Sequence, residues 1–304
     1  VSFGMFRAVQ SAGGRWGQEF VSWDTCPLHT LPIREITEKL RRAFAQHNHI
    51  FSEKTLWGVW MGTPHVVIVV KEKIPLEVLR AIEWSNLLSP PFENLWIHQA
   101  NQVGRKIFQH RQFQPLSGLP IGSNHPLLAF RQVAQSLLKE ARAQALSALL
   151  APQPSLIVDL YCGTGELSLL LPPSTGWIGI ELSSDAAAFA NKLRFSPGVT
   201  HAAFTGSVEQ RLLDPRVREK IVGRYSLYLN PPRPGLGHVA QENLIKLLHV
   251  NPPETIVYLS CSSSSLARDL RAFEANGYQV KTLQPYDFFP QTEHFETLAV
   301  LRKS

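Results

Sequence analysis

The chain has 304 residues, of which 44% are hydrophobic and 18% are charged, and its formal net charge is +6. This length suffices for two domains that each bury a core. The sequence contains no run of about 18 apolar residues and no charged start followed by an apolar block, so we expect no membrane span and no signal peptide. The mild basic excess is compatible with a polyanionic partner but does not require one.

The first part of the chain alternates helical and strand patterns. Apolar residues at helical intervals predict a helix over 31–48, and two strands around a Gly-Thr-Pro turn are predicted within 56–73. A second helix is predicted over 76–88. The stretch 113–126, rich in Pro, Gly, Ser and Asn, is predicted to be a loop and is the best boundary candidate. These patterns indicate a smaller N-terminal α+β domain over residues 1–122.

The second part, residues 123–304, follows a different rhythm. A helix over about 127–150 is predicted to precede strands at 155–161, 176–182, 199–206, 225–232 and 255–261, with helical segments in between. Short apolar strands that alternate with helices are typical of an open α/β fold with a mostly parallel sheet. Residues 278–289 and 295–303 resemble strands with no helix between them, so we expect an antiparallel last strand.

The segment DLYCGTGELSLLL has the features of a nucleotide-binding turn. It places Asp159 at a strand end, then Gly163 and Gly165 in the turn before a helix, where a backbone can approach a ligand closely. Glu181 ends the next strand, where it can accept hydrogen bonds from the ribose hydroxyls of an adenosine. Ser168 replaces the third glycine of a dinucleotide fingerprint, which favours a single nucleoside. A merely tight turn is the structural alternative.

Three cysteines, Cys26, Cys162 and Cys261, stand singly along the chain. Their spacing argues against a disulfide framework, suits a reducing cytoplasm and cannot supply four thiolates to a metal cluster, so no metal is expected. Cys261 ends an apolar strand at the edge where open α/β sheets bind ligands, and the serines and helix start that follow can lower its pKa. From these residues alone it is either a nucleophile or a buried structural cysteine.

Several motifs follow one another in a fixed order along the chain. They are FRQV (130–133), DLYCGTGELSL (159–169), NPPRPGL (230–236), LSCSSSSLARDL (259–270) and FPQTEHFETLAVL (289–301), with weaker ones at 24–32 and 101–110. In order and spacing this series resembles the S-adenosylmethionine-dependent RNA 5-methyluridine methyltransferases. The resemblance implies a Rossmann-like methyltransferase domain, S-adenosylmethionine as cofactor and RNA as partner.

The resemblance also implies roles for individual residues. Cys261 matches the family's nucleophile, which adds to C6 of uracil, and Glu296 matches the carboxylate that removes the C5 proton. Arg233 is expected at an RNA phosphate or in an ion pair that holds its loop, and His294 is expected beside Glu296 on the substrate side. The implied cofactor-binding residues are Gln132, Asp159, Tyr161, Gly163, Gly165, Glu166, Glu181 and Asn230.

The chain departs from the family's pattern at several positions. The replacements are Asn230 for an aspartate, Ser262 and Ser263 for an Asn-Pro pair, Ser207 for an acidic residue that faces the adenine, and Ala134 for an asparagine. An amide can still form hydrogen bonds but supplies no carboxylate. The RNA-binding β-barrel and the four-cysteine iron–sulfur motif of many relatives are also missing from this sequence, although Cys26 resembles the last cluster ligand.

The leading hypothesis is a monomeric cytoplasmic enzyme that makes 5-methyluridine in RNA, with rRNA favoured over tRNA by the segment LARDL. The alternative is a degenerate relative that binds RNA without chemistry, motivated by Asn230, Ser207 and the lost Asn-Pro pair. A third reading is an amino-group methyltransferase, because NPP after the fourth strand recurs in enzymes that methylate exocyclic amines. Arg233 stands where those enzymes usually have an aromatic residue.

Overall fold

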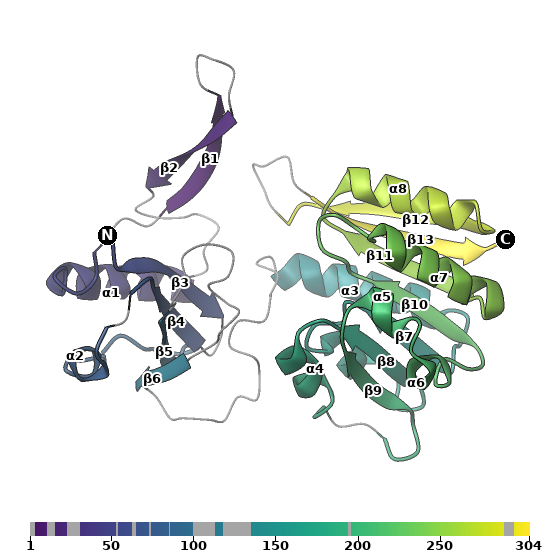
Figure 1. Cartoon of the computed structure of the whole chain (residues 1–304), viewed down its shortest axis with the longest axis horizontal. Helices are drawn as coiled ribbons and strands as arrows, with labels where there is room; N and C mark the ends of the chain where they lie inside the picture. Colours follow the sequence, from purple (N-terminus) through teal and green to yellow (C-terminus); the bar gives the residue numbers. More distant parts are fainter. Residues whose placement is uncertain are drawn as a thin grey trace. The chain divides into compact units, whose positions relative to one another are not determined.

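The protein divides into two compact units, Val1–Leu128 and Ala129–Ser304, each with its own sheet and core (Figure 1). The computed structural model describes residues 4–10, 16–22, 31–52, 54–62, 65–72, 74–84, 86–99, 113–117, 135–193, 196–288 and 295–304. The boundary predicted at 122/123 stays a prediction. Within the described ranges, none of the helices has the length and apolar character that a membrane crossing needs.

The first unit contains a β-hairpin and a four-stranded sheet. The hairpin pairs β1 (Gly4–Gln10) antiparallel with β2 (Trp16–Ser22). The sheet has the order β3-β4-β5-β6, in which only β4 and β5 run parallel. Its strands are β3 (Leu56–Gly62), β4 (His65–Val70), β5 (Asn94–Gln99) and β6 (Phe113–Ser117), and its helices are α1 (Leu31–Gln46) and α2 (Leu76–Arg80).

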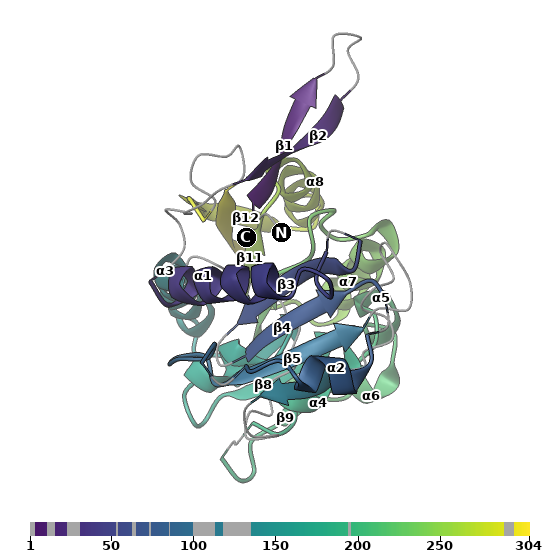
Figure 2. The same ribbon diagram turned by 90° about the vertical axis from the view of Figure 1, so that its left-hand side faces the viewer.

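The core of this unit lies between the sheet and its helices, which cover one face (Figure 2). The apolar stripe of α1 buries Ile36, Leu40 and Phe44, as the spacing in the sequence predicts. These side chains belong to one cluster with Ile68 of β4 and Ile97 of β5. The mixed sheet with its helices agrees with the predicted α+β domain.

Two local predictions for this unit were wrong. The helix predicted over 76–88 ends at Arg80, because turns after it bury the apolar residues Ile82 and Trp84 and let the Trp84 indole donate to the Leu79 carbonyl at 2.8 Å. The segment 113–117, predicted to be loop, is the edge strand β6. An edge strand tolerates a proline such as Pro115 because its outer side needs no ladder hydrogen bonds.

The second unit is a seven-stranded sheet in the order β12-β13-β11-β10-β7-β8-β9. Its strands are β7 (Leu156–Leu160), β8 (Gly176–Glu181), β9 (His201–Thr205), β10 (Tyr225–Leu229), β11 (Thr255–Ser260), β12 (Tyr278–Tyr286) and β13 (Glu296–Lys303). β13 is antiparallel to both of its neighbours, β11 and β12, and all the other neighbouring pairs are parallel. The predicted Rossmann-like fold with an antiparallel last strand is therefore confirmed.

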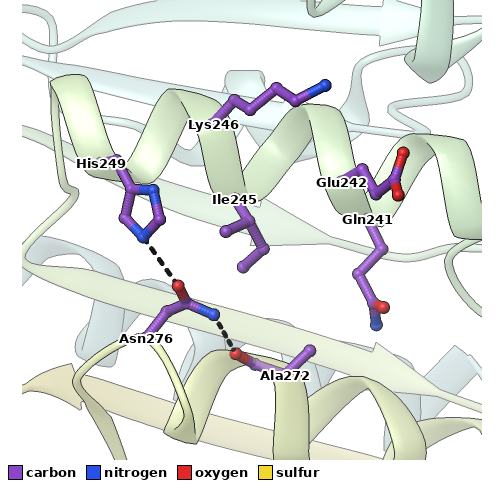
Figure 3. A pocket seen from close by; sticks show the side chains of 7 residues that line it. All are labelled: Gln241, Glu242, Ile245, Lys246, His249, Ala272 and Asn276. Carbon is purple, nitrogen blue, oxygen red and sulfur yellow. Dashed lines mark hydrogen bonds between the residues drawn. The ribbon is translucent and has the colours of Figure 1, made fainter.

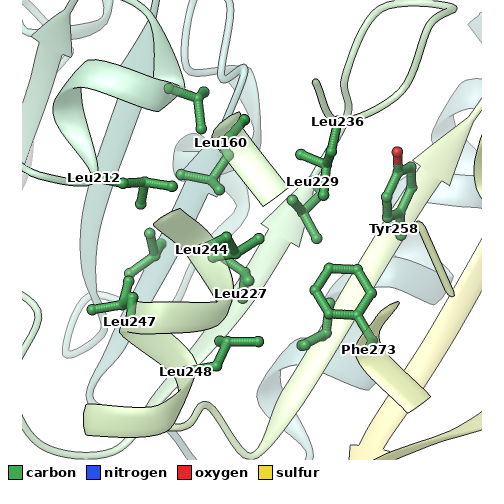
Figure 4. Packing of buried hydrophobic residues seen from close by; sticks show 14 of the residues in the cluster. Leu160, Leu212, Leu227, Leu229, Leu236, Leu244, Leu247, Leu248, Tyr258 and Phe273 are labelled. Atoms are coloured by element: carbon green, nitrogen blue, oxygen red, sulfur yellow. The ribbon is translucent and has the colours of Figure 1, made fainter. Parts of the chain in front are cut away.

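Helices cover both faces of this sheet. They are α3 (Gln135–Leu150), α4 (Ser184–Ala190), α5 (Val208–Arg211), α6 (Pro215–Arg218), α7 (His238–Val250) and α8 (Ser263–Glu274), and a 3-10 turn, η1 (Glu166–Leu170), follows β7. On one face α3 and α4 pack against Trp177 and Val257. On the other, Leu244 and Leu248 of α7 pack near Leu227 of β10 (Figure 4).

The strand order reverses between β7 and β10, because the chain continues outward through β8 on one side and through β11 on the other. At such a reversal the crossover helices lie on opposite faces, and the crevice at the carboxyl ends of the strands is where ligands bind. We call this side of the sheet the carboxyl edge. It comprises the ends of β7, β8, β10 and β11 and the start of the antiparallel β13.

Candidate functional site

The turn after β7 carries two glycines with left-handed backbone, Gly163 at φ 56° and Gly165 at φ 73°. A Cβ atom at Gly163 would meet no atom within 4 Å, whereas one at Gly165 would lie 2.9 Å from Cβ of Ala190 in α4. Gly163 therefore borders open space at the carboxyl edge. Gly165 instead allows the turn to pack closely against α4.

Glu181 fastens this turn to the end of β8. One carboxylate oxygen accepts the Gly163 N–H at 2.9 Å, and the other accepts the Ser183 N–H at 2.8 Å. Each oxygen has a second lone pair, so both can still accept a hydrogen bond from a ligand hydroxyl. The position and remaining capacity of Glu181 fit the predicted contact with a ribose.

Asp159 lies one residue before the end of β7 and is 1% exposed. Its Oδ2 accepts a hydrogen bond from the Trp177 indole at 3.2 Å, whereas Oδ1 has no hydrogen-bond partner among the described residues. Burial, and secondarily the charge of Glu181, raises the pKa of this carboxyl to about 7, although the Trp177 bond and Arg142 act in the opposite direction. A buried acceptor without a donor indicates a place for a ligand that donates a proton or carries positive charge.

Glu166, the first residue of η1, forms an ion pair with Arg142 of α3 at 2.7 Å. The charge of Arg142 also acts on Asp159 and on Tyr228, where it offsets part of the rise in pKa that burial causes. Glu166 is therefore near the glycine turn, as predicted, and its described contact is with the protein. Arg142 brings a positive charge to a group of carboxylates at the carboxyl edge.

Asn230 follows β10 directly, and its backbone N–H donates to the Leu160 carbonyl at 3.3 Å. It is thus beside the end of β7. Tyr161 has a left-handed backbone at φ 64° and packs against the hydrophobic cluster beneath α7 and α8. Burial raises its pKa, and the carboxylates that add to this shift are those of Glu209 and Asp269. Tyr161 therefore faces the opposite side of the sheet from Trp177.

Cys261 and Glu296 meet across two neighbouring strands. β11 and β13 pair in a continuous antiparallel register that runs from Thr255 opposite Arg302 to Ser260 opposite Thr297. One further step in this register places Cys261 opposite Glu296. Side chains directly opposite in an antiparallel pair have Cβ atoms about 5 Å apart. The half-buried thiol and the buried carboxylate of Glu296, which is 3% exposed, therefore lie within reach of the same ligand.

The surroundings of the Cys261 thiol act on it in opposite directions. Burial raises its pKa above the ordinary value, and the negative charge of Glu296 raises it further. The guanidinium of Arg233 acts on the same sulfur by charge and hydrogen bonding and lowers the pKa. The thiol is therefore mostly protonated at neutral pH, with one cation beside it that favours the thiolate.

Ser262 and Ser263, which replace the family's Asn-Pro pair, begin α8. Ser262 is the N-cap, and its hydroxyl accepts the Ser265 N–H at 3.4 Å. Its own N–H donates to the Ser260 hydroxyl at 3.2 Å. Hydrogen bonds of serine hydroxyls thus hold the turn after Cys261.

The carboxyl edge collects most of the predicted site residues that the structure describes. These are Asp159, Gly163, Glu166, Glu181, Asn230, Arg233, Cys261 and Glu296. Gln132 and His294 lie outside the described residues, as does Cys26. Ser207 caps α5, where its hydroxyl accepts the Gln210 N–H at 3.4 Å.

Trp177 and Arg142 were not predicted as site residues from the sequence. Trp177 lies inside an apolar strand, where the pattern predicts a core residue. The sequence does not indicate that the indole N–H donates to Asp159. Arg142 adjoins Ala141 and Ala145, two buried positions of α3, and a charge beside an apolar stripe is usually solvated. A small-residue stripe with one arginine at its border is the signal that was available.

A shallow groove on the outer surface of α7 and α8 holds none of these residues (Figure 3). It is lined by Gln241, Glu242, Ile245, Lys246, His249, Ala272 and Asn276. The amide oxygen of Asn276 accepts a hydrogen bond from Nε2 of His249 at 2.8 Å, and its amide nitrogen donates to the Ala272 carbonyl at 2.7 Å. These contacts join the ends of the two helices, and the groove contributes nothing to the chemistry at the carboxyl edge.

The sequence model of the tRNA (uracil-5-)-methyltransferase family matches residues 130–304, which is more than half of the chain. The chain belongs to this family. The matched segment includes every site residue named above from Asp159 to Glu296.

Two curated relatives are uncharacterized RNA methyltransferases. One, from Caldanaerobacter subterraneus subsp. tengcongensis, is 37% identical over 150 residues, which cover 49% of this chain and 31% of the relative. Another, from Protochlamydia amoebophila, is 36% identical over 185 residues, which cover 58% of this chain and 41% of the relative. The matched part thus spans less than half the length of each relative.

Among solved structures, the crystal structure of the Pyrococcus abyssi tRNA (uracil-54, C5)-methyltransferase in complex with S-adenosyl-L-homocysteine has a similar fold. The TM-score is 0.67 at 20% sequence identity, and the alignment covers 93% of this chain and 70% of that one. The likeness extends the shared fold to the first unit, which the family match does not include.

Proposed function

We propose that this protein is an S-adenosylmethionine-dependent RNA methyltransferase that methylates C5 of uridine, with Cys261 as nucleophile and Glu296 as base. The observation that carries the proposal is the β11–β13 register, which brings the only thiol at the end of β11 opposite a buried carboxylate in a member of the uracil-5 methyltransferase family.

The carboxyl edge fits an adenosyl cofactor. Gly163 borders open space, and Asp159 presents a buried acceptor without a partner among the described residues. Glu181 would accept the ribose hydroxyls, the turn at Gly163 would lie against the cofactor, and Asp159 would face its positive charge. S-adenosylmethionine supplies the electrophilic methyl group that the activated C5 carbon takes up.

Cys261 and Glu296 would do the remaining chemistry. C5 of uracil is too weak a nucleophile to be methylated unaided, so the Cys261 thiolate adds to C6 and turns C5 into an enolate-like carbon. After methylation C5 still carries its original proton. Glu296 removes that proton, and the electron pair of the broken C–H bond restores the C5–C6 double bond while the thiolate leaves. The products are 5-methyluridine, S-adenosylhomocysteine and one proton.

The serine turn at the start of α8 supports an active site over a degenerate one. Ser262 caps α8 and hydrogen-bonds Ser260, so Cys261 is held without the Asn-Pro pair. Asn230 is the departure that favours the second candidate, an RNA-binding relative without chemistry, because an amide cannot replace a carboxylate as a proton acceptor. Cofactor binding without methyl transfer to any uridine would support this second candidate.

For the RNA class we favour rRNA, from the segment LARDL (266–270), and hold tRNA as the competing substrate. The family model and the Pyrococcus abyssi neighbour are named for tRNA. The two hypotheses predict label in different RNAs, so one assay distinguishes them.

The test incubates the protein with methyl-labelled S-adenosylmethionine and with rRNA or tRNA from cells that lack 5-methyluridine. We expect label in 5-methyluridine after digestion to nucleosides, and no label with Cys261→Ala. Label in another nucleoside, or label that persists in Cys261→Ala, would contradict the proposal. Cofactor binding by wild type and variant serves as the folding control.

A further inference from the structure

Asp269 of α8 is a fully buried carboxylate that binds the loop after β10. Its Oδ2 accepts the Leu236 N–H at 2.8 Å and the Tyr258 hydroxyl at 2.7 Å. Its Oδ1 accepts from the Gln241 amide at 3.2 Å and from two nitrogens of Arg268, at 2.9 and 3.0 Å. Every acceptor direction of this carboxylate is used, and one of them is used by the loop.

Arg268 binds the same loop from its backbone side. One guanidinium nitrogen donates to the carbonyls of Pro234 at 2.8 Å and Leu236 at 2.9 Å. Between them, Gly235 has φ 75°, and a Cβ atom there would lie 2.5 Å from an Asp269 oxygen. We call residues 230–237 the β10–α7 loop. Pro234 and Leu236 of this loop thus form hydrogen bonds with Arg268 or Asp269, and the space beside Gly235 is too small for a side chain.

Ser265 connects the loop to the turn that holds the cysteine. Its hydroxyl lies 2.9 Å from the Arg233 carbonyl oxygen and 3.2 Å from the Ser262 carbonyl oxygen. Ser262 directly follows Cys261. One hydroxyl group therefore contacts the backbone of Arg233 and the backbone next to Cys261.

These contacts form one cluster on α8, which we call the α8 polar cluster: Ser265, Arg268 and Asp269. We propose that the α8 polar cluster is a positioning device that holds the β10–α7 loop so that the Arg233 guanidinium stays beside the Cys261 sulfur. The inference rests on the proposed function of Cys261 as nucleophile. Arg233 is then the group that favours the thiolate, and Arg268 acts on Cys261 only through Arg233.

The positioning role accounts for two buried polar groups at this place, the carboxylate of Asp269 and the hydroxyl of Ser265. A scaffold role alone would be met by apolar packing between α8 and the loop, without the cost of a buried carboxylate. Directional hydrogen bonds to the consecutive carbonyls of Arg233 and Pro234 instead fix the position of the loop along α8, and the first of these carbonyls belongs to Arg233 itself.

The test measures the alkylation of Cys261 by iodoacetamide across pH, with peptide mass spectrometry to quantify Cys261 and Cys162 separately. Arg233→Gln removes the cation and should move the Cys261 profile to higher pH. Each unit by which the pKa rises lowers the thiolate fraction at a given pH tenfold and raises the reactivity of each thiolate about threefold. The alkylation rate below the midpoint should therefore fall about threefold for each unit of increase in pKa.

Arg268→Gln should shift the Cys261 profile in the same direction although this side chain does not act on the sulfur. Arg271→Gln, on an exposed position one turn along α8, loses the same charge and should leave the profile unchanged. Ser265→Ala is the second positioning variant, and it removes one hydroxyl only. Arg233→Lys keeps a positive charge and should give a profile closer to wild type than that of Arg233→Gln.

A merely structural cluster would lower the melting temperature of Arg268→Gln and Ser265→Ala and leave the alkylation midpoint of the folded protein at the wild-type value. That result, or an unshifted profile in Arg233→Gln, would overturn the proposal. Methyl transfer is measured on the same preparations. If wild type methylates no RNA, the proposed function fails, whereas the alkylation profiles still report whether the cluster positions Arg233.

Discussion

Gly163 and Gly165 have the same left-handed backbone but different surroundings, so alanine should act differently at the two positions. At both sites an alanine is strained by about 1–2 kcal/mol, and the more restricted unfolded chain returns about 0.4–1 kcal/mol. Only at Gly165 does the new methyl group collide, 2.9 Å from Ala190 and 3.2 Å from the Trp177 ring. Overpacking of this kind costs about 1–3 kcal/mol.

The strain and chain-entropy contributions cancel when the two variants are compared with each other. We therefore expect Gly165→Ala to be about 1–3 kcal/mol less stable than Gly163→Ala in urea unfolding followed by tryptophan fluorescence. Binding of S-adenosylhomocysteine, measured by calorimetry, should show the reverse order, because only the methyl group at 163 would extend into the open space at the carboxyl edge. Equal unfolding free energies, or unimpaired binding by Gly163→Ala, would refute this reasoning.

Three further changes test other parts of the site. The pKa of Asp159 is raised to about 7 in the folded protein, so its protonated form stabilises the fold fully below about pH 4, and this stabilisation is lost as pH rises toward 7. The unfolding free energy of Asp159→Asn should therefore rise relative to that of wild type by up to roughly 4 kcal/mol between about pH 4 and about pH 7 in urea unfolding. A constant difference between the two proteins would contradict the assignment. Glu296→Gln should leave the methylated uridine bound to Cys261, so a band of protein covalently linked to RNA should appear in denaturing gels even when the RNA contains ordinary uridine. Free 5-methyluridine at the wild-type rate would exclude Glu296 as the base. Gly235→Ala should lower the melting temperature, because its methyl group would lie 2.5 Å from Asp269, and unchanged melting would show that the loop moves freely.

Much of the second unit can be predicted from sequence because its strands are short, continuously apolar and separated by helices. β7 and β11 are buried at every position, which is the pattern of central parallel strands. The first unit was harder. β6 contains Pro115 and turn-forming residues, so its strand conformation depends on pairing with β5 and cannot be recognised locally.

The candidate site shows the same division. Asp159, Glu181 and Cys261 lie at or next to the ends of apolar strands, and the topology brings these strand ends together, so their proximity follows from the pattern. The opposition of Cys261 and Glu296 depends instead on the register of β11 and β13, which a one-residue slip would destroy. The hydrogen bond from Trp177 to Asp159 and the α8 polar cluster arise from side-chain packing between distant segments, and the sequence carries no local signal for them.

The most direct test of the account is to incubate the wild-type protein and S-adenosylmethionine with RNA in which uridine is replaced by 5-fluorouridine, and to map the cross-linked peptide by mass spectrometry. Fluorine leaves Glu296 no proton to remove, so the account predicts a stable adduct in which Cys261 carries a methylated 5-fluorouridine nucleotide. An adduct at another residue, or none with an RNA that the protein methylates, would contradict the assignment of Cys261 as the nucleophile.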